Sequence, residues 1–330
     1  MTSSRLHIAF AGTFATRLAE PVQARVDVPC DVTLAGETEI VSRLDGVDVL
    51  VTMAFTRAMG AVARGLRLVQ VPGAGLDRID RSALPSGARL ANAHGHEVGI
   101  AEHVIGSLLA MSREFRRLDE RLRRGQWESQ WAVGAPPPSP WPELAGKTLG
   151  ILGYGRIGQA LARRARAFDM AIWGIRGDPG RSAAHGLDFL GGPEALDQVL
   201  RRADHVAITL SLSAATRGLL GARELGLMKP TAFLVNVARA EIVDEVALYA
   251  ALARRAIAGA ALDVWYRYPA APGPARPANL PFHQLDNVLL TPHVSGWTEG
   301  MLAARAAVIA LNIGRTARGE MPVNLIPPAG

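Results

Sequence analysis

The stretch TLGILGYGRIGQALARRARAFDMAIWGIR, residues 148–176, decides the fold. It contains two short apolar runs, residues 149–152 and 170–175, and both are typical of buried strands. A glycine-rich turn and an amphipathic segment, residues 156–168, separate them, and this segment predicts a helix. The order of strand, turn, helix and strand predicts a βαβ unit with parallel strands.

The turn has the pattern G-Y-G-R-I-G, and each glycine has its own physical reason. Gly153 permits the tight turn, Gly155 lets the backbone approach a pyrophosphate, and Gly158 lets the helix pack closely on the strand. The helix N-terminus adds unpaired N–H groups and the positive end of the helix dipole. Glycine turns also occur in ordinary strand–turn–helix units. Here strand, helix and second strand stand in register, which favours dinucleotide binding.

The end of the second strand indicates which dinucleotide is bound. An acidic residue there accepts hydrogen bonds from the ribose 2′-hydroxyl of NAD. This chain has Arg176 instead, and a guanidinium suits the 2′-phosphate of NADP. Asp178 lies two residues further on and allows NAD if the loop bends back. We therefore expect NADP to be preferred over NAD, unless Arg176 is only a solvated surface charge.

Composition limits the remaining choices. The 330 residues, 49% of them apolar, suffice for two domains of ordinary size. No apolar run approaches the roughly 20 residues that span a bilayer, and the first residues lack the apolar core of a signal peptide. Cys30 is the single cysteine, which fits a reducing cytoplasm. We expect a cytoplasmic protein without a membrane partner.

The net charge of +6 raises the question of nucleic-acid binding. The basic residues are nearly all arginines, and they are scattered along the chain. Their densest groups, residues 116–124 and 163–166, have helical spacing and no zinc-ligand or aromatic-rich motif beside them. We interpret them as solvated helix faces and expect a small anionic substrate, no nucleic acid and no metal.

The rest of the chain alternates strands and helices, as in parallel α/β sheets. Strands are expected at residues 6–11, 32–34, 47–51, 66–71, 205–210, 232–235 and 259–264. Long helices are expected at residues 99–124 and 298–318, and Asp244 is placed to cap another. The proline-rich run at residues 134–142 cannot be regular structure and forms an exposed arm.

Two side chains that follow strands predict the chemistry. Reduction of a 2-keto acid needs a cation that clamps the carboxylate and polarises the carbonyl, and an acid that protonates the alkoxide. Arg239 suits the first role through its bidentate geometry, and His293 suits the second. Each residue alone is more often a surface or packing residue, but together with the glycine turn they favour hydride transfer.

Ordered motifs along nearly the whole chain resemble the D-isomer-specific 2-hydroxyacid dehydrogenases. They include VPGAGLDRID, ELAGKTLGILGYGRIG, MKPTAFLVNVARAEIVDEVAL, GAALDVW and NVLLTPHVSGWTEG. The resemblance implies a homodimer with two open parallel-sheet α/β domains. A Rossmann dinucleotide-binding domain with a dimerisation arm, residues 99–296, is inserted in a flavodoxin-like substrate domain, residues 1–98 plus 297–330.

The resemblance also assigns site residues. Arg239 matches the substrate-binding arginine, and His293 matches the acid/base histidine. The matching substrate-binding positions are Met53, Ala54, Phe55, Ala74 and Gly75. The cofactor-binding positions are Gly153, Tyr154, Gly155, Arg156, Ile157, Gly158, Arg176, Ser211, Thr216, Val237, Ala238, Asp263 and Gly296. Ser211 stands where relatives usually have proline.

One departure from the family is serious. Its third catalytic residue is a glutamate five positions after the aspartate of the ALDV motif, and counting from Asp263 gives Tyr268. Formate dehydrogenases of the same superfamily have glutamine there and a serine–glycine pair after the histidine, which Ser295 and Gly296 resemble. Trp297 has no clear counterpart, and its ring is expected to narrow the cleft.

Three functions stay open at this point. The first is an NADP-preferring reductase of a 2-keto acid such as glyoxylate or hydroxypyruvate. The second is a dehydrogenase that oxidises another small anion, formate-like or a phosphorus oxyanion, because the glutamate is missing. The third is a nucleotide-sensing binding protein without enzymatic activity, as in the co-repressors of the family, but intact Arg239 and His293 argue against it.

Overall fold

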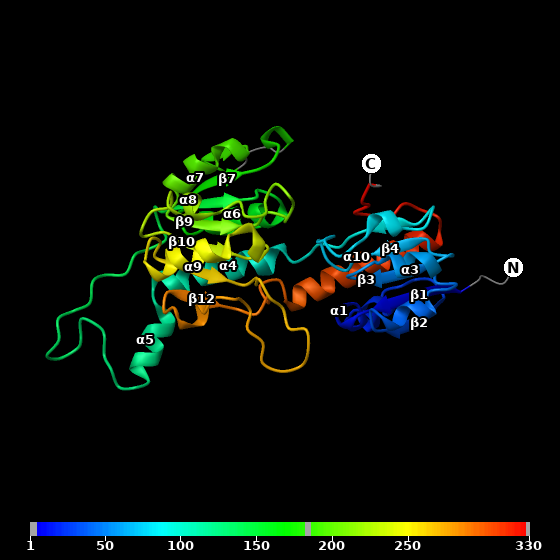
Figure 1. Ribbon diagram of the computed structural model, residues 1–330, viewed down its shortest axis with the longest axis horizontal. Coiled ribbons are helices and arrows are strands. Elements are labelled where there is room, and N and C mark those ends of the chain that lie inside the picture. Colours follow the sequence, from blue (N-terminus) through cyan, green and yellow to red (C-terminus); the bar gives the residue numbers. More distant parts are fainter. Residues whose placement is uncertain (1–4, 182–185, 328–330) are drawn as a thin grey trace. The chain divides into compact units, whose positions relative to one another are not determined.

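The computed structural model describes residues 5–181 and 186–327. The chain splits into two compact units (Figure 1). Unit 1 consists of Met1–His96 and Trp297–Gly330, and unit 2 consists of Glu97–Gly296. Substrate binding by unit 1 and dinucleotide binding by unit 2 stay predictions.

Unit 1 is built on a five-stranded sheet with only parallel pairings. Its strand order, β2-β1-β3-β4-β5, is the flavodoxin-like order, and the predicted fold is confirmed. The strands are β1 (Leu6–Ala11), β2 (Cys30–Ala35), β3 (Val49–Thr52), β4 (Leu68–Gln70) and β5 (Arg89–Ala91). The helices are α1 (Thr13–Arg17), α2 (Ala19–Gln23), α3 (Arg57–Val62), α10 (Glu299–Ala317) and the 3₁₀ turns η1 (Glu39–Arg43) and η2 (Arg81–Ala83).

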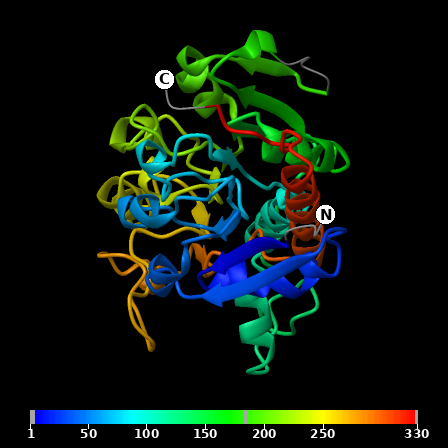
Figure 2. The ribbon, with the colours of Figure 1, turned by 90° about the vertical axis from the view of Figure 1, so that its right-hand side faces the viewer.

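Helix α10 brings the end of the chain back to unit 1. Ile309 and Ile313 of α10 belong to the same buried cluster as Ile8 and Phe10 of β1. Figure 2 shows α10 (red) close to the blue strands β1 and β2. A buried amide pair fixes its register, because Asn312 Nδ2 donates to Gln70 Oε1 at 2.7 Å. Burying both amides is tolerable only because they bond to each other and to the backbone.

Unit 2 is built on a seven-stranded parallel sheet of order β12-β11-β10-β9-β6-β7-β8. Outward from β6 this is the Rossmann order with one added strand, as predicted. Its strands are β6 (Thr148–Leu152), β7 (Ala171–Ile175), β8 (Phe189–Gly191), β9 (His205–Ile208), β10 (Phe233–Asn236), β11 (Gly259–Leu262) and β12 (Val288–Leu290). Its helices are α4 (Glu97–Ser112), α5 (Phe115–Leu122), α6 (Arg156–Arg166), α7 (Leu196–Arg202), α8 (Ala222–Leu225), α9 (Glu245–Ala253) and the turns η3 (Pro179–Arg181), η4 (Pro193–Ala195), η5 (Ala240–Ile242) and η6 (Phe282–Gln284).

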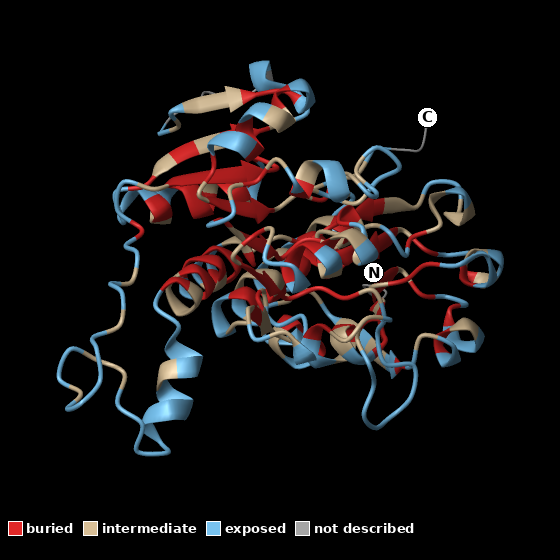
Figure 3. Ribbon diagram, turned by 60° about the vertical axis from the view of Figure 1, so that its left-hand side comes forward, coloured by how far each residue is buried: buried red, intermediate tan, exposed pale blue. Residues whose placement is uncertain are grey.

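Both faces of this sheet are covered, which explains why its strands are uniformly apolar. Helices α4 and α6 pack on one face, and α7 and α9 cover the other. The strands β6, β9, β10 and β11 in the middle of the sheet are buried over nearly all of their length and red in the burial view, while α5 is mostly pale blue (Figure 3). Asp244 caps α9 as predicted, since Ala247 N donates to Asp244 Oδ1 at 2.8 Å. Within the described ranges, no helix has the length and apolarity to cross a membrane.

The predicted helix at residues 99–124 is wrong in one respect. The structure divides it, because Glu114 has a left-handed φ of 51° between the end of α4 and the start of α5. Helix α4 has a buried face, whereas α5 has no buried residue. Its arginine-rich sequence provides no face that is buried in the core. The helix therefore leaves the sheet and begins the exposed arm (Figures 1 and 3).

Candidate active site

The three glycines of the turn after β6 occupy three different environments. Gly153 has a φ of +107°, and a Cβ there would lie 2.7 Å from Leu210 N. A Cβ on Gly158 would lie 2.7 Å from Gly153 O, so the helix approaches the turn too closely for a side chain. A Cβ on Gly155 would meet nothing within 4 Å. The backbone around Gly155 is therefore accessible at the N-terminus of α6, as a pyrophosphate requires.

A neighbouring strand holds this turn in place. Thr209, directly after β9, donates from Oγ1 to Gly153 O at 2.7 Å. The turn follows β6, which has β7 on one side and β9 on the other. It therefore lies at the point where the strand order reverses. Open α/β sheets bind ligands at such a switch point. Sequence reasoning missed Thr209, because the Rossmann strand order places β9 beside β6 but does not show which side chain reaches the glycine turn.

Arg176 and Asp178 follow β7 at the same edge of the sheet. Arg176 N donates to Gly191 O at 3.0 Å, which fixes its backbone beside β8, and its side chain is half-buried. Asp178 Oδ1 accepts from Gly180 N at 3.2 Å, so one carboxylate oxygen closes its own turn. Residues 182–185 lie outside the described part.

The loop after β9 is also closed from within. Thr216 Oγ1 donates to Ser211 O at 2.8 Å and accepts from Ser213 N at 2.8 Å. Ser211 is exposed. The Thr216 hydroxyl thus bonds to two backbone groups of this loop.

Arg239 follows β10 on a loop that a buried asparagine organises. Asn236, 1% exposed, accepts from Ala238 N at 3.1 Å and donates from Nδ2 to Arg239 O at 3.0 Å. The Arg239 guanidinium donates to Ala238 O at 2.8 Å and is half-buried. Val237 and Ala238, which directly precede Arg239 in the chain, are buried. Asn236 was not among the predicted site residues, although its place at the end of a strand was a usable signal.

Asp263 holds the loop that carries His293. Its Oδ1 accepts from Thr291 Oγ1 at 2.6 Å and from Val294 N at 2.9 Å, and its Oδ2 accepts from Ser295 N at 2.8 Å. The residue is 1% exposed, and these bonds compensate for burying its carboxylate. Its observed role is therefore to shape the His293 loop, beside the predicted role in lining the nicotinamide.

Tyr268 lies against His293. The distance between Tyr268 Oη and His293 Nδ1 is 2.6 Å, and the ring centroids lie 5.6 Å apart. Burial raises the pKa of Tyr268, so the phenol is neutral near neutral pH. It can donate to Nδ1 or accept from it, but it brings no charge.

The glycine turn, Arg239, Asp263 and His293 follow β6, β10, β11 and β12, so all lie at the carboxyl edge of one sheet. In unit 1, the predicted substrate-binding residues follow β3 and β4. Phe55 and Ala54 are buried there, at 1% and 5% exposure, which leaves Met53 as the only half-exposed side chain of that loop. Asn92 Nδ2 donates to Ala74 O at 3.1 Å and steadies the loop that ends in Gly75.

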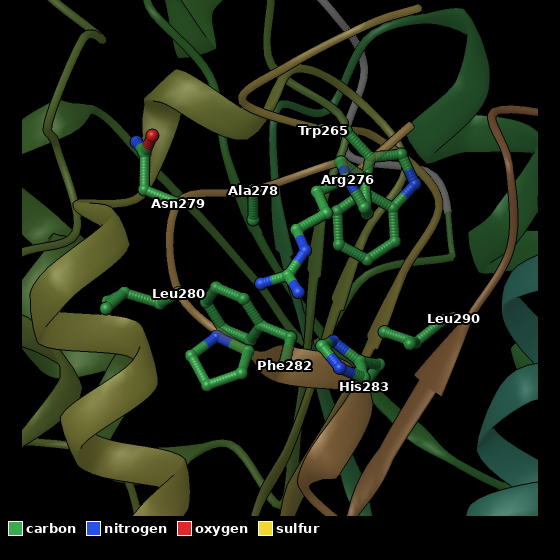
Figure 4. Close-up of a pocket in the computed structure, with 10 residues that line it drawn as sticks. Trp265, Arg276, Ala278, Asn279, Leu280, Phe282, His283 and Leu290 are labelled. Carbon is green, nitrogen blue, oxygen red and sulfur yellow. The ribbon is translucent and has the colours of Figure 1, made fainter. Parts of the chain in front are cut away.

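The cavity in Figure 4 lies under the loop that carries Tyr268. Trp265, Phe282 and Leu290 line it together with Arg276, and its volume is about 20 Å³. That space holds about one water molecule. It is therefore too small for a dinucleotide or a keto acid, and it belongs to the packing under the loop.

The chain matches a known family model and is similar to several named proteins. Residues 105–295 match the family model described as D-isomer specific 2-hydroxyacid dehydrogenase, NAD binding domain. A glyoxylate reductase of Pyrococcus furiosus is 36% identical over 293 residues, which cover 87% of this chain and 84% of that protein. A D-3-phosphoglycerate dehydrogenase of Methanocaldococcus jannaschii is 34% identical over 296 residues, but this chain spans only about half of its length, 53%.

Solved structures show the same fold over the whole chain. A 2-hydroxyacid dehydrogenase of Ketogulonicigenium vulgare superimposes with a TM-score of 0.80 and 28% identity, covering 99% of both chains. A D-isomer specific 2-hydroxyacid dehydrogenase of Xanthobacter autotrophicus, solved in complex with NADPH and MES, gives a TM-score of 0.78 and 27% identity, covering 98% of both chains.

The glycine environments generate a stability prediction. Gly153→Ala should lower the free energy of unfolding by at least about 2 kcal/mol, because the residue has a positive φ and a Cβ would overlap the backbone of Thr209 and Leu210, directly after β9. Gly155→Ala, the matched control, should cost less than about 1 kcal/mol, because its Cβ meets open space. Urea unfolding followed by circular dichroism measures both. Equal losses would contradict the assigned environments.

Proposed function

The chain belongs to the D-isomer-specific 2-hydroxyacid dehydrogenase family of NAD(P)-dependent oxidoreductases acting on CH–OH groups, and we propose that it reduces small 2-keto acids with NADPH. The observation that carries this proposal is the contact of Tyr268 with Nδ1 of His293, at the sheet edge that also holds Arg239 and the glycine turn. Glyoxylate and hydroxypyruvate are the substrates we favour, and the names of the glyoxylate reductase relatives support this class.

The roles of the two charged side chains follow from their chemistry. The Arg239 guanidinium clamps the substrate carboxylate and polarises the keto oxygen through charge-assisted hydrogen bonds. His293 gives its Nε2 proton to the oxygen that becomes the alcohol, while Tyr268 engages Nδ1. NADPH supplies the hydride when bound. The loops closed by Asn236 and Asp263 keep both side chains oriented before the substrate arrives.

The preference for NADPH rests on Arg176. It occupies the position after β7 where an acidic side chain would bind the ribose 2′-hydroxyl of NAD. One carboxylate oxygen of Asp178 accepts a hydrogen bond within its own turn. Asp178 is therefore less suited to accept hydrogen bonds from the ribose 2′-hydroxyl of NAD. NAD remains a second, poorer cofactor in this proposal.

We further propose a homodimer formed through the arm that begins at α5. The arm exposes large apolar side chains without a core of its own: Phe115 at 55%, Leu122 at 53%, Trp127 at 63% and Trp131 at 76%. Several large apolar side chains exposed along one arm favour an interaction site there. A second copy of the chain is the partner that the family resemblance implies.

A keto-acid panel with NADPH tests the proposed activity. Glyoxylate or hydroxypyruvate should be reduced, and Arg239→Ala should lower kcat/KM at least about a thousandfold, the scale for losing transition-state electrostatic contacts. Arg254→Ala, an exposed arginine of the same unit, is the control and should retain activity. A wild-type enzyme that reduces no keto acid, or an Arg239→Ala variant that keeps its turnover, would disprove the proposal.

The cofactor preference is tested at Arg176. We expect kcat/KM to be higher with NADPH than with NADH, and Arg176→Asp should reverse the order. A charged contact to phosphate contributes roughly 1.5–3 kcal/mol, which corresponds to about a tenfold to hundredfold change in the ratio. Arg201→Asp, an exposed position on α7, should leave the ratio unchanged. If Arg176→Asp also leaves it unchanged, Arg176 does not contact the ribose phosphate.

The Tyr268–His293 contact predicts a pH dependence. Reduction needs protonated His293, so kcat/KM should fall as the pH rises through the pKa of His293. Tyr268→Glu adds a negative charge that favours the imidazolium and raises this pKa. The falling limb should therefore move upward by about one pH unit or more. Oxidation needs neutral His293, and its rising limb should move in the same direction.

Tyr268→Gln is the matched control, because it has the size of the glutamate variant without the charge. Its pH profile should stay close to that of the wild type. The comparison requires that hydride transfer limits the rate. A kinetic isotope effect measured with a deuterated cofactor tests this requirement. Coincident profiles for the glutamate and glutamine variants would show that another group sets the pKa of His293.

A further inference from the structure

Helix α4 covers one face of the seven-stranded sheet, and this face continues just beyond the ends of β11 and β12. Ala261 of β11 and Leu289 of β12 pack in the same apolar cluster as the buried side of α4. Side chains two residues apart along a strand point to the same face. Asp263 and Thr291, each two residues further along, therefore lie on the α4 side as well.

His103 lies at the edge of the buried side of α4. It follows buried Ile100 by about one helical turn and directly precedes buried Val104. Its ring is half-buried, and its Nε2 lies 3.4 Å from Thr291 Oγ1. Through this side chain, α4 contacts the segment that carries His293.

The direction of each hydrogen bond at the Thr291 hydroxyl follows from its partner. The carboxylate of Asp263 can only accept, so Thr291 Oγ1 gives its single proton to Asp263 Oδ1, at 2.6 Å. The hydroxyl then offers lone pairs to His103, which must donate from Nε2. A donor on this side polarises the hydroxyl and strengthens its bond to the carboxylate.

The backbone of Thr291 is held independently of its hydroxyl. Thr291 N donates to Leu262 O at 3.0 Å, and Trp265 Nε1 donates to Thr291 O at 2.8 Å. The hydroxyl is therefore not needed to fix Thr291 itself. It orients the carboxylate of Asp263, which in turn accepts from the two backbone N–H groups that follow His293.

We propose that His103 is a positioning residue for the acid His293. It acts through two side chains, Thr291 and Asp263, and the proposal rests on the proposed role of His293. A rotation that exchanged the hydroxyl of Thr291 with its methyl group would remove one of the three donors to a carboxylate that is 1% exposed. His103 disfavours this rotation, because its N–H would lose its acceptor at the same time.

A packing role for His103 on the side of α4 is the alternative. The two roles differ in what they require of a substitute side chain. Packing requires an apolar side chain of similar volume, which leucine supplies. Positioning requires an N–H donor near the place of Nε2, which the amide of glutamine supplies.

His103→Leu and His103→Gln separate these roles. With glyoxylate and NADPH, His103→Leu should lower kcat about twofold to tenfold, the scale for one neutral hydrogen bond, with KM nearly unchanged. His103→Gln should retain most of kcat. Glu102→Leu, the neighbouring exposed position of α4, is the control and should leave kcat unchanged. An unchanged kcat in His103→Leu, or equal losses in His103→Leu and His103→Gln, would overturn the proposal.

A second pair of variants tests the middle of this relay. Thr291→Val keeps the shape of the side chain without the hydroxyl, and Thr291→Ser keeps the hydroxyl. Thr291→Val should lower kcat about tenfold or more, because its lost bond is to a charged group, and Thr291→Ser should lose less. Adding His103→Leu to Thr291→Val should then have no further effect on kcat. Losses that simply add would contradict the relay.

Nitrogen NMR of the labelled histidine rings separates this inference from the proposed activity, because it needs no turnover. The His293 resonances, identified by their loss in His293→Ala, should move in His103→Leu and stay in place in His103→Gln and Glu102→Leu. The His103 ring should carry a proton on Nε2 in the wild type. These results support the relay even if no keto acid is reduced and the proposed function fails. Unmoved His293 resonances in His103→Leu, or an unprotonated Nε2 of His103, reject the relay even if glyoxylate is reduced and the proposed function stands.

Discussion

The site depends above all on the buried carboxylate of Asp263. Its two oxygens accept three hydrogen bonds from the segment between Thr291 and Ser295, and one donor is a side-chain hydroxyl while two are backbone N–H groups. His293 lies inside this segment with a φ of 57°, a conformation that costs a side-chain-bearing residue free energy. The three bonds compensate for that cost and for the desolvation of the carboxylate. Without them, neither the backbone at His293 nor its distance to Tyr268 would be defined.

Other loops at the carboxyl edge of the sheet are also held by hydrogen bonds from a polar side chain. Asn236 closes the Arg239 loop, Thr209 anchors the glycine turn, and Thr216 closes the loop that starts at Ser211. Asn236 and Thr209 lie at or just beyond a strand end, whereas Thr216 lies within a loop, and all three bond to backbone groups outside the strands. Backbone groups that leave a buried sheet need such partners, because an unpaired buried amide is costly. The chemistry of this edge therefore rests on rigid loops, which present their side chains in a fixed geometry.

The sequence was sufficient wherever a local pattern has a single physical solution. The glycine turn and the alternation of apolar runs with amphipathic segments predicted two parallel α/β sheets, and this was confirmed. Strands β5 (RLA) and β8 (FLG) were not predicted, because neither lies in an apolar run as long as the one around the equally short β4 (LRLVQV). The break at Glu114 was missed because helical spacing continues through it, and only the absence of a core against α5 decides where α4 ends. Thr209 contacts the loop after another strand, and chain order does not show which side chain makes that contact. Asn236 bonds within its own loop, so its place at a strand end was a signal that could have been used.

A side chain that contacts Nδ1 of a histidine can orient the imidazole ring and can stabilise its charge, and Tyr268 is suited only to the first. A partner at Nδ1 orients the imidazole ring and selects the nitrogen that exchanges a proton with the substrate, and this requires only a hydrogen bond. A carboxylate partner additionally stabilises the charged imidazolium, and this requires a negative charge. At 2.6 Å from Nδ1, the phenol supplies the first function, but its raised pKa prevents it from supplying the second near neutral pH. The phenol also adds an apolar ring beside the histidine, which a carboxylate would not. In the proposed mechanism, the orientation and the charge of the acid are thus separable, and the Tyr268–His293 contact supplies the orientation.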